Sequence, residues 1–228
     1  MIFSAGMNDS ELFAQAKKEL FTALVGDVMD KMGLFQQFLP QHLKPLDPKM
    51  VVIGRAMTVL EEDLPKATPN ELLEKPFGIM FEALDQLREN EVYICSGSSP
   101  TYALWGGLMS TRAMKLGASG AILNGMSRDT NEILRLNFPT FSLGTYAVDQ
   151  GPRGRVVDYR TTIDFGGVTI RPGDIIFGDR DGVAVIPVES EKEVFDEAFE
   201  KARGEKLVMK ALQNGMSTVE AFDTYGIM

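Results

Sequence analysis

The middle third of the chain alternates short apolar runs with helical patterns, and this alternation constrains the fold more than any other feature. The apolar runs are "EVYICSG", "GAILNG" and "FPTFSLG", and the segments between them are "WGGLMSTRAMKLG" and "DTNEILRLN". Strands that alternate with helices are typical of βαβ units around parallel strands. The pattern therefore predicts an α/β fold in which polar residues just past the strands form the ligand crevice.

The N-terminal part of the chain predicts a helix, a strand and a loop. Residues 9–33 carry apolar side chains at steps of four and predict one amphipathic helix that ends at a glycine. Residues 50–60 predict a strand with a bulge or a close backbone approach at its glycine. Two prolines make 61–70 a predicted loop that could cover a site, and helical spacing returns after it with a break near Pro76.

The pattern changes after Gly144, where apolar runs are broken by turn residues. The turns are Pro-Gly-Asp at 172–174 and Asp-Gly at 181–182, which favour antiparallel strands and a hairpin. Residues 189–214 are charged on one side and apolar on the other, so they predict a final amphipathic helix.

Length and charge limit the function classes. The 228 residues can bury one full core, so residues 1–228 are expected to form a single domain with helices at both ends. Its 23 basic and 32 acidic residues give a net charge of −9 without a Lys/Arg cluster, which argues against nucleic acid and anionic membranes as partners. No apolar run is long enough to span a bilayer and no signal-like start is present, so we expect a cytoplasmic protein.

Few residues are available for histidine or cysteine chemistry. The only histidine, His42, lies in a Pro-rich stretch where a loop is expected, so a zinc site built on several histidines is impossible. The only cysteine, Cys95, lies within a predicted strand and is expected to be buried and inert. Glycine-rich nucleotide-binding motifs of the GxGxxG or P-loop kind are missing from the sequence.

Arg128 and Asp129 stand side by side where a predicted strand gives way to a helix. One interpretation is structural: Asp129 and Glu132 have the Asp-x-x-Glu spacing of a capping box, and Arg128 is a surface residue. The other is functional: the arginine holds a carboxylate with two hydrogen bonds while the aspartate holds a cation. The residues alone leave both interpretations open.

Two glycines precede a helix in "WGGLMSTRAM". The first free N–H groups of this helix belong to residues near Leu108 and Met109, and such a terminus can bind anionic oxygens. The alternative is that Gly106 and Gly107 only permit a tight turn. Trp105 is expected to pack in the core. Because both glycines and the Arg-Asp pair follow predicted strands, we expect the amides to face Arg128 across one crevice.

The sequence resembles the RraA-like family, which contains 4-hydroxy-4-methyl-2-oxoglutarate and 4-carboxy-4-hydroxy-2-oxoadipate aldolases and a regulator of ribonuclease activity. The resemblance rests on "GDVMDKMG", "VVIGRAMTV", "WGGLM", "GAILNGMSRD", "FPTFSLG" and "GGVTIRPGDIIFGDRDGVAVIP". It implies a layered α/β sandwich of the swivelling β/β/α type, with mixed strands and flanking N- and C-terminal helices. It also implies a homotrimer or homohexamer whose sites lie between subunits, with the C-terminal helix packed on a neighbour.

The resemblance also implies roles for individual residues. Arg128 would grip the pyruvyl group, Asp129 would hold Mg²⁺ or Mn²⁺, and the backbone amides from Gly107 to Met109 would bind the substrate carboxylate. The implied reaction is retro-aldol cleavage of a 4-hydroxy-2-oxo acid to pyruvate, and oxaloacetate could be decarboxylated at the same site.

The sequence departs from this family at Gly107, where the catalytic members carry an acid. Water ligands could replace that acid, or Glu200 or Glu205 of a neighbouring subunit could supply a carboxylate. Two alternatives to the aldolase therefore remain. One is a non-catalytic, protein-binding regulator of ribonuclease, and the other is a related enzyme with a different oxo-acid substrate.

Overall fold

The computed structural model describes residues 6–227, and it confirms the predicted α/β class. A nine-stranded mixed sheet follows the order β1-β8-β6-β4-β2-β10-β3, with β13 paired to β2 and β14 paired to β13. Its strands are β1 (Lys44–Pro45), β2 (Val52–Asp63), β3 (Phe77–Gly78), β4 (Glu91–Ser96), β6 (Gly120–Leu123), β8 (Thr140–Ser142), β10 (Gly154–Tyr159), β13 (Ile175–Gly178) and β14 (Val183–Ile186).

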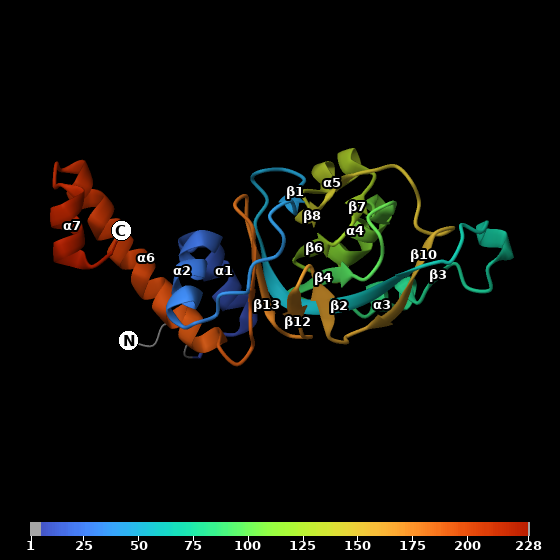
Figure 1. Ribbon diagram of the computed structural model, residues 1–228, viewed down its shortest axis with the longest axis horizontal. Helices are drawn as coiled ribbons and strands as arrows, with labels where there is room; N and C mark the ends of the chain where they lie inside the picture. The colour runs from blue at the N-terminus through green and yellow to red at the C-terminus, as the bar shows by residue number, and fades with distance from the viewer. Residues whose placement is uncertain (1–5, 228) are drawn as a thin grey trace.

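Two smaller sheets and the helices complete the fold (Figure 1). The small sheets contain β5 (Ala103–Trp105), β7 (Met126–Ser127) and β9 (Gly144–Thr145), and β11 (Ile163–Phe165) with β12 (Val168–Ile170). The helices are α1 (Asp9–Glu19), α2 (Thr22–Lys31), the 3-10 turn η1 (Asn70–Leu72), α3 (Met80–Asp85), α4 (Gly107–Lys115), α5 (Thr130–Leu136), α6 (Glu191–Gln213) and α7 (Thr218–Tyr225).

The centre of the large sheet is parallel, as the alternating pattern predicts. Strands β2, β4, β6 and β8 pair in parallel, with Ile94 beside Ile122 in the register. Side chains on one face, such as Tyr93 and Leu123, are buried with residues of α3 to α5, and those on the other face, such as Ile94, are buried with residues of β11 and β12. Burial on both faces explains why these strands are uniformly apolar.

Strand β2 is longer than the sequence predicts. It continues through Asp63 into the segment expected to be a loop, because its last residues pair with β10 in antiparallel register. The loop prediction for residues 61–63 is therefore wrong, and a glutamate, Glu61, becomes a buried strand residue. The expected close approach at the glycine is confirmed: a Cβ on Gly54 would lie 2.3 Å from the carbonyl oxygen of Asn90.

The single N-terminal helix predicted over residues 9–33 is two helices. Leu20 and Phe21 are extended, and α2 begins anew at Thr22. The restart has a distant cause: the Asp179 carboxylate accepts hydrogen bonds from the Thr22 backbone N–H (2.8 Å) and hydroxyl (2.6 Å). The predicted end at Gly33 is confirmed by its left-handed φ of 78°.

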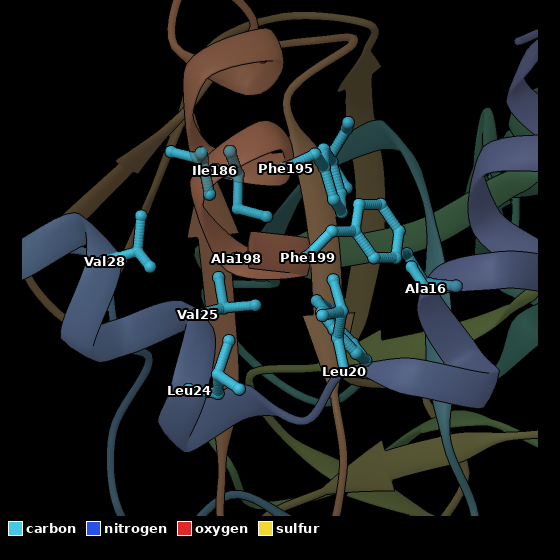
Figure 2. Packing of buried hydrophobic residues seen from close by; sticks show 14 of the residues in the cluster. Ala16, Leu20, Leu24, Val25, Val28, Ile186, Phe195, Ala198 and Phe199 are labelled. Atoms are coloured by element: carbon cyan, nitrogen blue, oxygen red, sulfur yellow. The ribbon is translucent and has the colours of Figure 1, made fainter. Parts of the chain in front are cut away.

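The predicted C-terminal helix is α6, and α7, which the sequence does not predict, follows it. Figure 2 shows Phe195, Ala198 and Phe199 of α6 packed with Val25 and Leu24 of α2. The rest of α6 and α7 extend away from the sheets (Figure 1). Packing of this arm on a neighbouring subunit stays a prediction.

Several local predictions are confirmed. Strands β13 and β14 form a hairpin closed by the bond from Asp179 N–H to the Gly182 carbonyl, and Gly173 has the positive φ (91°) of its turn. Cys95 is fully buried, and burial raises the pKa of its thiol well above the usual value. His42 lies in an exposed turn. No helix within residues 6–227 has the length and apolar character needed to cross a bilayer.

The hydrogen bonds from Thr22 to the Asp179 carboxylate are expected to stabilise the start of α2. Asp179→Ala removes both hydrogen bonds from Thr22 and the one from the Asp181 N–H, and it is expected to lower the free energy of unfolding by about 1–2 kcal/mol. The matched control is Asp181→Ala, an exposed aspartate in the same turn, which is expected to change it by less than about 0.5 kcal/mol. Urea unfolding of both variants measures the difference, and equal effects would show that the cap contributes nothing.

Candidate functional site

Arg128 and Asp129 are positioned by a short strand that follows the predicted one. The "GAILNG" strand ends at Leu123, and β7 then pairs in parallel with β5 and β9. The backbone N–H of Arg128 donates to the Trp105 carbonyl at 2.9 Å, which brings the Arg-Asp pair next to the two glycines. The two features therefore lie side by side, and Leu108, Met109, Arg128 and Asp129 line one cavity.

The Asp129 side chain caps α4 and not the helix that it begins. Its backbone is left-handed, with φ 55° and ψ 36°, and its carboxylate makes no capping bond to α5. Instead, Oδ2 accepts a hydrogen bond from the Gly107 N–H at 3.1 Å. The predicted capping box with Glu132 is thus wrong, because the left-handed turn directs the carboxylate elsewhere; Glu132 pairs with Arg135.

The Arg128 guanidinium is oriented by Asp149. Nη1 lies 3.0 Å from Asp149 Oδ1, and the two side chains are 37% and 31% exposed. An isolated bridge between Ala103 and Asp149 places this aspartate beside β5. Sequence analysis missed Asp149, because its segment, "TYAVDQGPRG", has no periodicity that marks it as part of a site. An arginine has five N–H donors, so one ion pair leaves others for a ligand.

The amides at the start of α4 are open to a ligand. The Gly107 N–H donates to Asp129 and the Ser110 N–H donates to the Gly106 carbonyl. Within residues 6–227, no acceptor lies in hydrogen-bond geometry with the N–H groups of Leu108 and Met109. A Cβ on Gly106 would lie 2.6 Å from Asp129 Oδ2, so this glycine is needed for the close approach of the two segments.

These groups line one cavity of about 230 Å³. Its polar lining comes from Arg128, Asp129, Asp149 and Gln150, and its apolar lining includes Phe77, Phe81, Leu104, Trp105 and Leu108. Trp105 is 1% exposed and its ring packs on Tyr93 and Phe138, so the prediction that it belongs to the core is confirmed even though it also lines the cavity. Arg128 and Asp129 also border a second cavity of about 390 Å³ beside Tyr146.

A buried acid lies next to this cavity. Glu61 is 2% exposed, and its Oε2 accepts a hydrogen bond of 2.6 Å from Gln150, which lines the cavity. Burial raises the pKa of Glu61 to about 8, so the carboxyl is mainly protonated at neutral pH. Glu61 Oε1 and the Tyr93 hydroxyl are buried without a hydrogen-bond partner among the described residues.

Two carboxylates of the described residues line the cavity, and Asp149 is paired with Arg128, which leaves Asp129 as the candidate ligand of a metal ion. Asp129 Oδ2 is engaged by Gly107, and Oδ1 has no hydrogen-bond partner within residues 6–227. The described part of the chain contains no group of three or more His, Cys, Asp or Glu residues placed to hold a metal ion. Asp129 therefore fits an ion such as Mg²⁺, which keeps several water ligands, but does not form part of a closed protein cage.

The other predicted acids are not at the cavity in this chain. Glu205 pairs with Lys201 on α6 at 2.6 Å, and Glu200 is exposed on the same helix. Neither lines the two cavities beside Arg128. A role for either of them in a neighbouring subunit stays a prediction.

The comparison with known proteins decides the family. The RraA-like family model, described as Aldolase/RraA, matches residues 22–185. The chain belongs to the RraA-like family. The fold agrees with this assignment: the chain is similar to Streptomyces coelicolor RraAS2, described as an unusual member of the RNase ES inhibitor RraA protein family. That structure has a TM-score of 0.74 at 21% identity, and the match covers 88% of this chain and 96% of the other.

Other proteins that are similar to this chain differ in their names and lengths. A protein of Halalkalibacterium halodurans, named provisionally as a 4-hydroxy-4-methyl-2-oxoglutarate aldolase, is 29% identical over 95% of this chain and 96% of its own length. Protein DlpA of Legionella pneumophila is 27% identical over 90% of this chain, which spans only 32% of DlpA. A solved structure titled as novel cellulases from gut-associated microbes is 32% identical, with a TM-score of 0.79 over 88% of each chain.

The raised pKa of Glu61 predicts how stability depends on pH. Between the usual glutamate pKa of 4.5 and the folded value of about 8, the folded chain keeps a proton that the unfolded chain releases. This group therefore makes the free energy of unfolding fall as pH rises, by up to about 1.4 kcal/mol per pH unit. Glu61→Gln is expected to remove this slope and to make the protein more stable than wild type at pH 8.

Urea unfolding at pH 5.5 and pH 8 measures the slope for each protein. The matched control is Glu62→Gln, which changes the exposed neighbour on the same strand and should keep the wild-type slope. A Glu61→Gln slope equal to that of wild type would contradict the assignment of a protonated Glu61.

Because Glu132 lies close to Gly107, we expect a side chain at position 107 to lower the free energy of unfolding. A Cβ on Gly107 would lie 2.9 Å from the Cβ of Glu132 and 3.3 Å from its Cγ. Gly107→Ala is therefore expected to destabilise the protein by about 1–3 kcal/mol, and Gly107→Asp by at least as much. Helix propensity alone predicts the opposite sign for Gly107→Ala, a gain of up to about 1 kcal/mol.

A double-mutant cycle with Glu132→Gly tests the contact. In the Glu132→Gly background, which lacks the Glu132 Cβ, Gly107→Ala should no longer lower the free energy of unfolding. Stabilisation by Gly107→Ala in the wild-type background would show that the family's acid could be accommodated at this position.

Proposed function

We propose that this protein is a divalent-metal-dependent lyase that cleaves a 4-hydroxy-2-oxo acid to pyruvate. The observation that carries the proposal is the meeting of three groups at one cavity: the Arg128 guanidinium, the Asp129 carboxylate and the open amides of α4. The provisional aldolase name of a family member with nearly the same length supports it.

Each group has a task that its chemistry suits. The amides of Leu108 and Met109, with the remaining N–H donors of Arg128, bind the carboxylate and the adjoining oxo group of the substrate. Asp149 holds the guanidinium in place, so the donors are oriented before the substrate arrives. A Mg²⁺ or Mn²⁺ ion at Asp129 would act as a Lewis acid for the charge that develops on the 2-oxo oxygen as the C3–C4 bond breaks.

The same charge develops when oxaloacetate loses carbon dioxide, so oxaloacetate decarboxylation is a second activity expected of this site. Both reactions should therefore require the same residues. Loss of Arg128 or Asp129 should impair both reactions, whereas a change in substrate specificity could separate them.

We also propose that the protein is a homotrimer or homohexamer in the cytoplasm, with sites between subunits. The arm of α6 and α7 extends away from the sheets (Figure 1). It supports an interface because it carries exposed apolar side chains. These side chains are Leu207, Met209, Val219, Phe222 and Tyr225.

A second candidate function is a protein-binding regulator without catalytic activity. The observation that favours it is Gly107, at the position where the resemblance to the aldolases implies an acid. The RNase inhibitor family named for the Streptomyces coelicolor structure provides the precedent for such a function.

Pyruvate release tests the lyase. The purified protein is incubated with oxaloacetate or 4-hydroxy-4-methyl-2-oxoglutarate, with and without Mg²⁺ or Mn²⁺, and pyruvate is followed with a coupled dehydrogenase. Metal-dependent release is expected, and Asp129→Asn should reduce it about 100-fold or more, because the charge is lost while an oxygen remains for the Gly107 amide. Arg128→Lys should raise KM, because a lysine cannot form the same pair of hydrogen bonds.

The matched control is Arg112→Ala, which removes an exposed arginine of α4 that pairs with Asp85. It should leave pyruvate release unchanged. Pyruvate release that survives unchanged in Arg128→Ala, or no release from any substrate by the folded oligomer, would overturn the lyase and favour the regulator.

A further inference from the structure

The cavity beside Arg128 has polar and apolar lining residues that come from different parts of the fold. Arg128 and Asp129 follow β7, and the open amides belong to α4. Strand β3 and helix α3 provide the apolar residues Phe77, Met80 and Phe81. We infer that this cavity binds a monocarboxylic 2-oxo acid with an apolar far end more tightly than a dicarboxylic one, and that Phe77, Phe81 and Leu108 contact that apolar end. The inference rests on the proposed function for the oxo-acid head and adds the class of the substrate.

The charges of the cavity favour one carboxylate. Arg128 is the one basic residue of the lining, against the two carboxylates of Asp129 and Asp149, so the lining carries one net negative charge. A divalent cation reverses this to one net positive charge, which a monocarboxylate neutralises. The described residues of this chain that line the cavity provide no cationic partner for a second carboxylate: Arg153 donates to the Asp149 carbonyl at 3.1 Å and does not line the cavity.

The apolar lining contains side chains whose exposure a ligand would reduce. Phe81 is 56% exposed and Leu108 is 87% exposed, although both lie on the cavity. The rings of Phe77 and Phe81 form a pair with centroids 5.6 Å apart. Contact with an apolar group of the ligand removes this surface from water, which favours binding in proportion to the area buried.

The backbone of Phe77 supports a specific role for its ring. Its φ is 65°, in the left-handed region that bulky residues rarely adopt. Such conformations cost free energy and persist where the surrounding structure requires them, often at ligand sites. Here the conformation is held by the pairing of β3 with β10, where Phe77 lies beside Arg155.

The size of the cavity limits the ligand. Its volume of about 230 Å³ is below the range of about 300–1,000 Å³ that is usual for drug-sized ligands. The space therefore suits an oxo-acid head with a short alkyl chain or a single ring.

The only tryptophan of the chain, Trp105, lines this cavity, so its fluorescence reports binding without catalysis. The probes, each in the presence of Mg²⁺, are pyruvate, 2-oxohexanoate and 2-oxoglutarate, which share the head and differ at the far end. The full chain is expected to bind 2-oxohexanoate at least tenfold more tightly than 2-oxoglutarate and more tightly than pyruvate.

Two variants of Phe81 make the test specific. Phe81→Ser should reduce the ratio of 2-oxohexanoate affinity to pyruvate affinity about fivefold, and Phe81→Arg should raise 2-oxoglutarate affinity about tenfold by providing the missing cation. The matched control is Phe35→Ser, since Phe35 is 74% exposed and does not line the cavity; it should leave the ratio unchanged.

The outcomes separate this inference from the lyase. Preference for 2-oxohexanoate without pyruvate release from any 4-hydroxy-2-oxo acid would support the inference and overturn the lyase. Pyruvate release together with equal or tighter binding of 2-oxoglutarate would support the lyase and overturn the inference. No binding of any probe, or an unchanged ratio in Phe81→Ser, would also overturn the inference.

Discussion

The candidate site depends on one hydrogen bond, from the Gly107 N–H to the Asp129 carboxylate. Gly106, at the start of α4, has no side chain to cap the helix, and Asp129 provides the cap from 22 positions along the chain. The bond joins the first turn of α4 to the turn that carries Arg128. As a result, the open amides and the guanidinium keep a fixed distance and orientation relative to each other. Donors held in this way can bind a small anion with directional hydrogen bonds.

The adjacent opposite charges of Arg128 and Asp129 do not neutralise each other. The left-handed turn at Asp129 directs its carboxylate to α4, while the guanidinium pairs with Asp149. Each charge thus has its own partner and keeps unused hydrogen-bonding capacity. Glu132 lies against Gly107, so the position where the resemblance to the aldolases implies an acidic side chain is closely packed. Among the described residues of the cavity, Asp149 is paired with Arg128, whereas the Asp129 carboxylate makes no ion pair.

The features that sequence analysis predicted are those with local causes. Apolar runs between helical patterns are enough to identify β4, β6 and β8, and glycines mark the turn at Gly173 and the end of α2. The missed features depend on distant partners. Pairing with β10 turns the acidic end of β2 into a strand and buries Glu61, and Asp149 reaches Arg128 from a segment without periodicity. The capping-box pattern at Asp129 was present in the residues, but the backbone conformation that decides its use was not visible in them.

The start of α2 shows what a distant cap means for the way this chain reaches its fold. Thr22 and Asp179 are separated by 157 positions, and the aspartate lies in the turn between β13 and β14. The contact between Thr22 and Asp179 therefore closes a very long loop. Such non-local contacts carry a large loop-closure entropy and are typical of folds that form slowly.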